Sequence, residues 1–208
     1  MKVSPIWTRL NSTTAHNTNV NSIIFILLSL SFLWALYALI PAIILKRYVT
    51  YTSPVIHELV RVSGVRVRVV IKRDASVNAF SLPNNVIVIT EGLANQGQDN
   101  LRSALAHEVG HLKGFHHVKT FLLLTCLTGI SIFLIMNVNI IVGIVLMLIG
   151  IIIMRYTSRL FEFWADKYAV SLVGKSQYIQ LLTLNMDPKE RSTMFSTHPT
   201  IMNRLKKI

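Results

Sequence analysis

Five residues near the middle of the chain, His107-Glu108-Val109-Gly110-His111, combine two metal-binding side chains with a carboxylate. Positions four apart on a helix share one face, so both imidazoles can reach a single metal ion. Glu108 lies beside the first histidine and can take a proton from water at that ion. This H-E-x-x-H spacing is a peptidase signature that chance rarely produces in a chain of this length. The motif predicts a zinc site with Glu108 as the general base.

The residues around the motif are typical of a helix. Leucine and valine recur at helical spacing at Leu101, Leu105 and Val109, which would bury one side of the helix. Asp99 and Asn100 are good cap residues for its beginning, and Gly114 is expected to end it. A helix over about 100–113 would therefore present His107 and His111 together.

A catalytic zinc ion usually has three protein ligands and an open position for water, so a third ligand must be found. His117 completes the pattern H-E-x-x-H-x-x-G-x-x-H, in which the third ligand follows a glycine turn. Glu162 is the alternative, on a predicted second helix that also carries Asp166. Those two carboxylates share a face, so Glu162 can bind the metal while Asp166 accepts the second N–H of a ligand histidine.

Glu162 is favoured over His117. The His117 arrangement needs the chain to turn back beneath the metal, but Lys119 is followed at once by the apolar run 121–124, which indicates the start of a membrane helix. His116 and His117 are then interpreted as polar residues at the boundary of the membrane.

Several separated segments resemble, in order, the integral-membrane zinc metallopeptidases that include HtpX and the CAAX prenyl proteases. The segments are 78–80, 90–93, 107–111, 159–166 and Thr197-His198-Pro199 with Arg204 after it. The resemblance covers roughly residues 50 to 208. It implies that Asn78 and Ala79 bind the substrate strand, and that His198 lies near the reacting carbonyl, where it can stabilise the developing oxyanion.

The N-terminal part of the chain indicates a membrane anchor. Of all residues 52% are hydrophobic and only 14% are charged, too apolar for an ordinary soluble domain. After a polar tail at 1–21, residues 23–45 carry no charge, and this run can cross a hydrocarbon core of about 30 Å. No small-residue cleavage site follows, and Lys46-Arg47 come directly after it, so a transmembrane helix over 22–46 is favoured over a signal peptide.

A second apolar region, 119–154, is expected to form a membrane hairpin. Residues 121–154 carry no charge, and Asn137 and Asn139 suggest a turn between two spans of about 15 to 17 residues, which is short for a membrane crossing. A hairpin that only dips into the bilayer is therefore the alternative to two complete spans.

The distribution of charge predicts the orientation. Basic residues follow the first span and the hairpin, which places the zinc domain in the cytoplasm and the N-terminal tail outside a plasma membrane. The net charge of +12 is interpreted as favouring attraction to anionic lipid headgroups and not binding of nucleic acid. The basic residues lie beside the membrane spans, and no aromatic platform for bases accompanies them.

The pattern predicts an α+β fold: a mostly helical gluzincin-type zinc peptidase domain with a small β-sheet, plus transmembrane helices. Residues 65–69 alternate as a half-buried strand, and 86–89 are apolar on both faces as in a buried strand. The catalytic domain is expected in two parts, 47–118 and 155–208, on either side of the hairpin. Helices are predicted at 155–172, after Asp187 and after Pro199.

These observations predict a membrane-bound zinc endopeptidase with one zinc ion per chain, acting on membrane or misfolded proteins. His107, His111 and Glu162 would hold the metal, Glu108 would move the proton, and Asp166 would orient a ligand histidine. A CAAX-type prenyl-peptide protease is the alternative, although such relatives typically have more spans. A non-catalytic membrane adaptor with a structural zinc is a third reading, which the presence of Glu108 disfavours.

Overall fold

The computed structural model describes residues 5–184 and 199–208, with side chains described from Val20 onward. The contacts divide the chain into two compact units, one formed by residues 1–39 and 122–152 and the other by 40–121 and 153–208. The predicted division at 47, 119 and 155 stays a prediction. The expected helix after Asp187 and the side chain of His198 lie outside the described residues.

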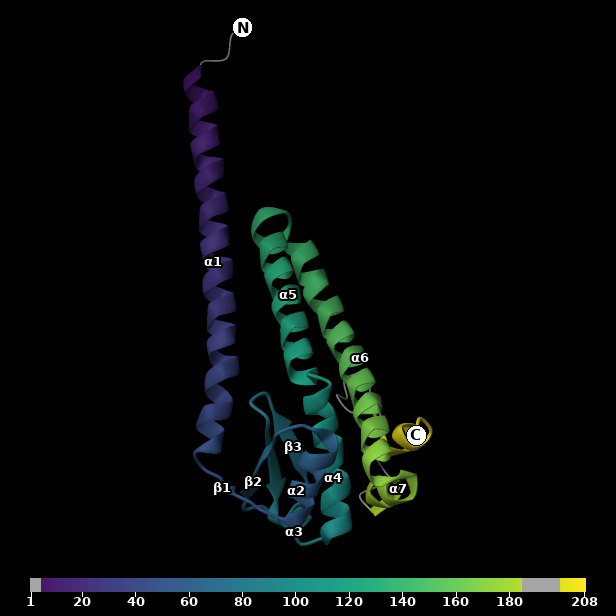
Figure 1. The fold of residues 1–208 in the computed structure, drawn as a ribbon. Coiled ribbons are helices and arrows are strands. Elements are labelled where there is room, and N and C mark those ends of the chain that lie inside the picture. Colours follow the sequence, from purple (N-terminus) through teal and green to yellow (C-terminus); the bar gives the residue numbers. More distant parts are fainter. Residues whose placement is uncertain (1–4, 185–198) are drawn as a thin grey trace. The chain divides into compact units, whose positions relative to one another are not determined.

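The first unit contains most of α1 (Pro5–Leu45) and residues 122–152 of the hairpin formed by α5 (His116–Asn137) and α6 (Ile140–Val173). The first residues of α5 and the C-terminal half of α6 belong to the second unit. The two hairpin helices lie side by side (Figure 1), and a Cβ added to Gly150 of α6 would contact Leu127 of α5. Asn139 caps α6 by accepting a hydrogen bond of 2.8 Å from the N–H of Ile141. The predicted turn at Asn137 and Asn139 is therefore where the hairpin reverses.

Three helices are long and apolar enough to cross a membrane, namely Val20–Leu45, His116–Asn137 and Ile140–Val173. Large apolar side chains on all three are exposed, as expected of surfaces that face lipid. α6 differs from the prediction because it continues without a break past residue 154. No glycine or proline lies between Gly150 and Gly174, so the helix has no reason to stop where the apolar run ends.

The second unit is built on a four-stranded mixed sheet with the order β1-β2-β4-β3. The strands are β1 (Val49–Thr50), β2 (Arg68–Lys72), β3 (Ala79–Leu82) and β4 (Val86–Thr90). β2 and β4 are parallel, whereas β1 and β3 are antiparallel to their neighbours. β3 therefore forms one edge of the sheet.

The helices of the second unit form the main core together with β2 and β4 of this sheet. Besides the C-terminal half of α6, these helices are α2 (Pro54–Ser63), α3 (Glu91–Ala94), α4 (Gln98–Lys113), α7 (Lys175–Leu184) and α8 (Ile201–Leu205). α7 packs against α4, and α8 packs against α7. Ile87 and Ile89 of β4 pack with Leu105 and Val109 of α4, and Val88 packs on the opposite face of the sheet with Phe80. β4 is thus buried on both faces, as its apolar sequence predicts.

The boundaries of two predicted elements differ from those observed. β2 begins at Arg68 and not at Val65, because Gly64 ends α2 with a φ of 69° and pairing with β4 starts only at Arg68. α4 begins at Gln98 with Gly97 as its cap, two to three residues before the predicted start, and ends at Lys113 as predicted. The expected fold class, an α+β fold in which helices predominate over a small sheet, is confirmed.

Candidate metal centre

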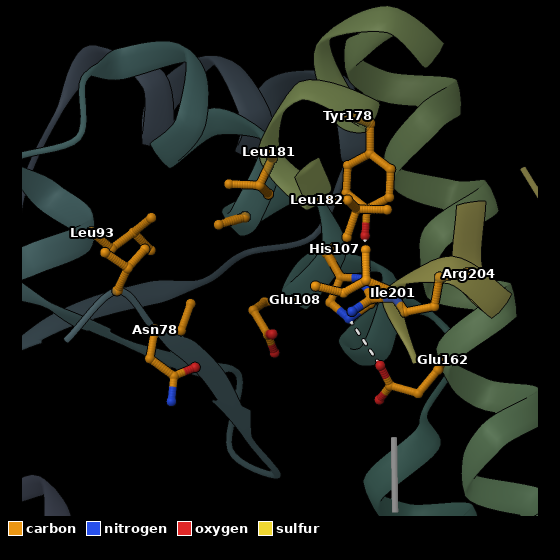
Figure 2. Close-up of a pocket in the computed structure, with 13 residues that line it drawn as sticks. Asn78, Leu93, His107, Glu108, Glu162, Tyr178, Leu181, Leu182, Ile201 and Arg204 are labelled. Atoms are coloured by element: carbon orange, nitrogen blue, oxygen red, sulfur yellow. Dashed lines mark hydrogen bonds and ion pairs between the residues drawn. The ribbon is translucent and has the colours of Figure 1, made fainter. Parts of the chain in front are cut away.

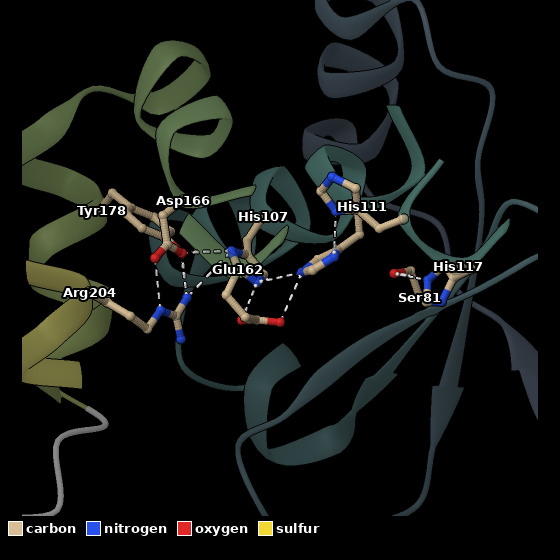
Figure 3. A network of polar contacts seen from close by, with 9 residues as sticks. Ser81, His107, His111, His117, Glu162, Asp166, Tyr178 and Arg204 are labelled. Atoms are coloured by element: carbon tan, nitrogen blue, oxygen red, sulfur yellow. Dashed lines mark hydrogen bonds and ion pairs between the residues drawn. The ribbon is translucent and has the colours of Figure 1, made fainter. Parts of the chain in front are cut away.

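α4 and α6 bring three candidate ligands together (Figure 3). Nε2 of His107 and Nε2 of His111 lie 3.1 Å apart. The carboxylate of Glu162 reaches both, with Oε1 at 3.3 Å from His111 and Oε2 at 3.5 Å from His107. The two histidines meet because they are one turn apart on α4.

A glycine allows α6 to approach α4 closely enough for Glu162 to reach the histidines. A Cβ added to Gly110 would lie only 3.0 Å from Cα of Ala165 and 3.1 Å from its carbonyl oxygen. The small residues at these two positions thus set the separation of the helices. The need for glycine at position 110, the fourth residue of the H-E-x-x-H motif, comes from this close helix contact and not from the backbone conformation.

The spacing of the three groups fits a zinc ion. Zinc bonds of about 2.0 to 2.2 Å in tetrahedral geometry put neighbouring ligand atoms roughly 3.3 to 3.6 Å apart. The separations of 3.1, 3.3 and 3.5 Å lie at or close to that range, the last two being measured to the two different oxygens of Glu162. With one ligand atom taken from each residue, the three atoms lie within 4.8 Å of one another. Among the described residues, His107, His111 and Glu162 form the one group of three such side chains with mutually close ligand atoms. Two imidazoles and one carboxylate are a donor set that zinc accepts, with a fourth position left for water.

The other nitrogen of His107 is held by a buried polar network. Nδ1 lies 3.0 Å from Oδ1 of Asp166 and 2.9 Å from the hydroxyl of Tyr178, which itself donates to Asp166 over 2.7 Å. Asp166 is fully buried, and Arg204 neutralises its charge through two hydrogen bonds. A proton on Nδ1 that points at Asp166 leaves the Nε2 lone pair free toward Glu162 and His111.

The network shifts the pKa of those of its members that lie outside the membrane helices. Burial lowers the pKa of His107, but its contacts with Asp166 and Glu162 outweigh burial and raise that pKa to about 9. Burial also disfavours the charge of Arg204, yet the hydrogen bonds to Asp166 hold its pKa above the ordinary value. The pKa of Tyr178 is raised by burial, so this hydroxyl stays neutral. A metal ion and the proton would compete for His107.

Glu108 opens onto a cavity beside the three ligands. The cavity has a volume of about 380 Å³ and is lined by both polar and apolar residues. In Figure 2 the carboxylate of Glu108 lies between the side chains of Asn78 and Glu162. The side chain of Glu108 is largely buried within the fold while its carboxylate faces this space.

His117, the other candidate for the third ligand, is placed elsewhere. Its Nε2 lies 2.9 Å from the hydroxyl oxygen of Ser81 on β3, and the group of three ligand atoms does not include it. The structure therefore brings Glu162, and not His117, to the two motif histidines.

Asn78 and Ala79 lie at the beginning of the edge strand β3 and line the same cavity as Glu108. Thr90 holds this segment in place: its hydroxyl accepts the N–H of Asn78 at 2.9 Å and contacts the carbonyl oxygens of Ser76 and Asn78 at 2.6 and 3.0 Å. A Cβ added to Gly92 would lie 2.2 Å from the carbonyl oxygen of Ala75. The segment Thr90-Glu91-Gly92-Leu93 thus positions the residues on either side of Asn78.

Two residues of the network had no role in the sequence analysis. Arg204 was noted only as part of the C-terminal segment, and Tyr178 carried no signal because it lies in an ordinary helical sequence far from the motif. His198 lies outside the described residues, so its expected place near the reacting carbonyl stays a prediction.

Comparison with known proteins decides the family. The sequence profile of peptidase family M48 matches residues 49–208, most of the chain. The chain belongs to peptidase family M48. The expected resemblance to the HtpX and CAAX protease group is confirmed.

Two known proteins are similar to this chain. The protein described as Protease HtpX homolog of Bacillus subtilis (strain 168) is 28% identical over 199 residues, which covers 74% of this chain and 67% of that protein. The crystal structure of S. mikatae Ste24p matches with a TM-score of 0.57 and 22% identity, covering 97% of this chain and 65% of that one. The chain thus spans about two thirds of the length of each, and the second likeness concerns the fold alone.

The family and the apolar helices together describe a membrane peptidase of family M48. The metal, the substrates and the orientation in the membrane are questions of function.

Proposed function

We propose that this protein is a zinc-dependent endopeptidase that cleaves membrane or misfolded proteins. The observation that carries the proposal is the grouping of His107, His111 and Glu162, whose ligand atoms lie within 4.8 Å of one another beside the carboxylate of Glu108. One zinc ion per chain is proposed, because the described residues offer one such group.

The residues divide the chemistry between them. A zinc ion held by His107, His111 and Glu162 would polarise the scissile carbonyl and lower the pKa of water toward about 7. Glu108 takes the proton from the attacking water and passes it to the departing amine. Asp166 fixes the Nδ1 proton of His107. His198 is proposed to donate a hydrogen bond to the oxyanion, as the family resemblance implies.

The edge of the sheet supports binding of an extended substrate. β3 pairs with β4 on one side only among the described strands, so its other side can accept backbone hydrogen bonds from a peptide. Asn78 and Ala79 lie at the end of β3 that borders the cavity. Backbone pairing requires no particular sequence, which suits a peptidase acting on many unfolded segments.

The apolar part of the cavity lining favours an apolar side chain next to the scissile bond. It includes Leu93, Ala104, Leu181, Leu182 and Ile201. Arg204 is the one arginine or lysine that lines the cavity among the described residues, and the carboxylate of Asp166 already binds it. A free C-terminal carboxylate would therefore gain little here, which supports endopeptidase over carboxypeptidase activity.

A CAAX-type prenyl-peptide protease is the second candidate. The sequence resemblance to the group that includes the CAAX prenyl proteases supports this candidate, and the fold, which is similar to that of S. mikatae Ste24p over 97% of this chain, is compatible with it. A prenylated peptide offered beside an unmodified apolar peptide separates the two functions. Selective cleavage of the prenylated peptide would replace the proposal above.

The protein is proposed to lie in the plasma membrane with its catalytic unit in the cytoplasm. Lys46, Arg47 and Arg155 follow the apolar runs on the side of the catalytic unit, as the positive-inside rule requires of cytoplasmic residues. The partners are peptide or protein substrates and the lipid bilayer.

The test is zinc-dependent cleavage of casein by the full chain purified in detergent. We expect one zinc ion per chain, loss of cleavage on chelation and recovery with zinc. Glu108→Gln is the matched control, because it removes the base but no ligand: this variant should bind zinc like the parent and cleave nothing. If Glu108→Gln cleaved casein at the parental rate, the proposed role of Glu108 as the base would be wrong. If the parent bound no zinc, the proposed zinc-dependent function would be wrong.

A further inference from the structure

A neighbouring histidine contacts the second ligand histidine on the nitrogen that faces away from Glu162. Nδ1 of His111 lies 3.0 Å from Nδ1 of His116, and the two rings meet edge to face with centroids 5.0 Å apart. The side chain of His116 is buried, with 4% exposed. The interpretation of His116 as a polar residue at the membrane boundary missed this contact.

One arrangement of protons agrees both with this contact and with a zinc ion on Nε2 of His111. A metal-binding nitrogen needs its lone pair, so a neutral His111 carries its proton on Nδ1. At 3.0 Å this N–H donates to Nδ1 of His116, which must then be unprotonated and accept. We propose that His116 is a positioning residue that fixes the proton and the ring orientation of His111 for zinc binding. This inference rests on the zinc site of the proposed function.

Aromatic side chains of α6 hold the ring of His116 in this position. The ring stacks on Phe161 with centroids 4.2 Å apart and an angle of 7° between the planes, and it meets Trp164 edge to face at 5.2 Å. Phe161 directly precedes Glu162. The same turn of α6 therefore supplies the third proposed ligand and the surface on which the partner of His111 rests.

The connection between α4 and α5 is built around this ring. A Cβ added to Gly114 would lie 2.3 Å from Nε2 of His116, although the αR backbone of Gly114 suits any residue. Glycine is required at this position by the ring and not by the backbone. Phe115 has a φ of 53°, a left-handed conformation that is unfavourable for a non-glycine residue. Both features bring His116 back against the last turn of α4.

The two ligand histidines would then have different partners. His107 faces the carboxylate of Asp166, whereas His111 faces an imidazole. A neutral acceptor forms a weaker hydrogen bond than a carboxylate. We therefore expect loss of His116 to weaken zinc binding by about tenfold, the lower end of the roughly 10- to 100-fold effect of such outer partners.

The test compares His116→Leu with His116→Asn in the purified full chain. Leucine fills the apolar site but cannot accept a hydrogen bond, whereas the side-chain oxygen of asparagine can accept from Nδ1 of His111. Zinc affinity is measured by competition with a coloured chelator, and the absorption spectrum of the cobalt-substituted protein reports the ligand geometry. We expect about tenfold weaker binding and a changed cobalt spectrum for His116→Leu, with His116→Asn closer to the parent. The reverse order would show that His116 only fills space and would overturn the proposal.

His117→Leu is the control on the adjacent residue, since His117 forms its hydrogen bond with Ser81 and its ring lies farther from His111 than that of His116, with centroids 6.3 Å and not 5.0 Å apart. It should bind zinc like the parent, and an effect equal to that of His116→Leu would overturn the proposal. If the parent itself binds no zinc, the proposed function and this inference fall together. If the parent binds zinc and His116→Leu binds it equally well, this inference alone falls.

A second measurement uses Gly114→Ala, whose added Cβ must displace the ring of His116. Alone, it should weaken zinc binding about as much as His116→Leu does. Combined with His116→Ala it should add almost nothing, because the ring is already absent, so the two changes are non-additive. Fully additive losses would contradict a shared role of these two residues.

Discussion

Asp166 and Arg204 form a bidentate ion pair, in which Nη2 of Arg204 donates to Oδ1 over 2.6 Å and Nε donates to Oδ2 over 3.0 Å (Figure 3). Oδ1 of the same carboxylate also lies 3.0 Å from Nδ1 of His107. A residue of the last described helix is therefore joined to a proposed zinc ligand through one buried carboxylate. Changes at Asp166 should affect both metal binding and stability.

Asp166→Asn should lower zinc affinity or activity by about 10- to 100-fold, less than the loss of a ligand, because it weakens the hydrogen bond that orients His107. It should also destabilise the fold by about 3 kcal/mol, since the largely buried charge of Arg204 loses its partner. Chelator competition measures the first effect and denaturant unfolding the second.

The control for this prediction is the double variant Asp166→Asn with Arg204→Gln, which removes both charges. It should recover part of the lost stability without recovering zinc affinity. An Asp166→Asn protein with parental affinity would remove Asp166 from the site and weaken the case for Glu162 on the same helix.

Glu162→Ala should reduce zinc occupancy far more than His117→Ala. Glu162 lies within 3.5 Å of both motif histidines, whereas His117 is paired with Ser81. Metal content after dialysis, measured by mass spectrometry, compares the two proteins. The opposite ranking would mean that His117 is the third ligand.

Thr90→Val should raise KM more than it lowers kcat. Valine keeps the shape of this buried side chain but removes the hydroxyl that holds the backbone of Asn78 at the start of β3. The unpaired buried groups should also cost about 1–3 kcal/mol of stability. Steady-state cleavage of a short peptide tests this, with Thr183→Val as a control because Thr183 is exposed and bonds only to helix carbonyls of α7. An unchanged KM would count against a substrate role for Asn78.

Topology reporters should place Lys46 and Ile208 in the cytoplasm and Asn137 outside. Basic residues follow the apolar runs near the first two positions, and Asn137 lies at the uncharged reversal between α5 and α6. Reporter fusions at the three positions show directly on which side of the membrane each position lies. A cytoplasmic reporter at Asn137 would mean that the hairpin does not cross the membrane.

The sequence by itself determined the features that depend on neighbouring residues. The spacing of His107 and His111 puts two imidazoles on one helical face whatever surrounds them, and uncharged runs of sufficient length predict spans. The apolar composition of residues 86–89 predicted a strand buried on both faces. In each case the signal and the structure lie in the same short stretch of chain.

The choice of Glu162 needed more than local pattern. Spacing alone allowed Glu162 and His117, and the preference came from the apolar run after Lys119. The approach of α6 to α4 at Gly110 and Ala165 is what brings Glu162 to the histidines. The two residues that contact each other there, Gly110 and Ala165, are 55 positions apart in the sequence.

Only the tertiary structure decided which residues surround the proposed ligands. Tyr178 and Arg204 reach Asp166 from α7 and α8, and neither lies in a sequence pattern that points to a metal site. His116 is closer in sequence, but its contact with His111 depends on the left-handed turn at Phe115 and on a ring of α6. Such contacts arise when separate elements pack together. A sequence pattern does not predict them, because periodicity describes one helix or strand at a time.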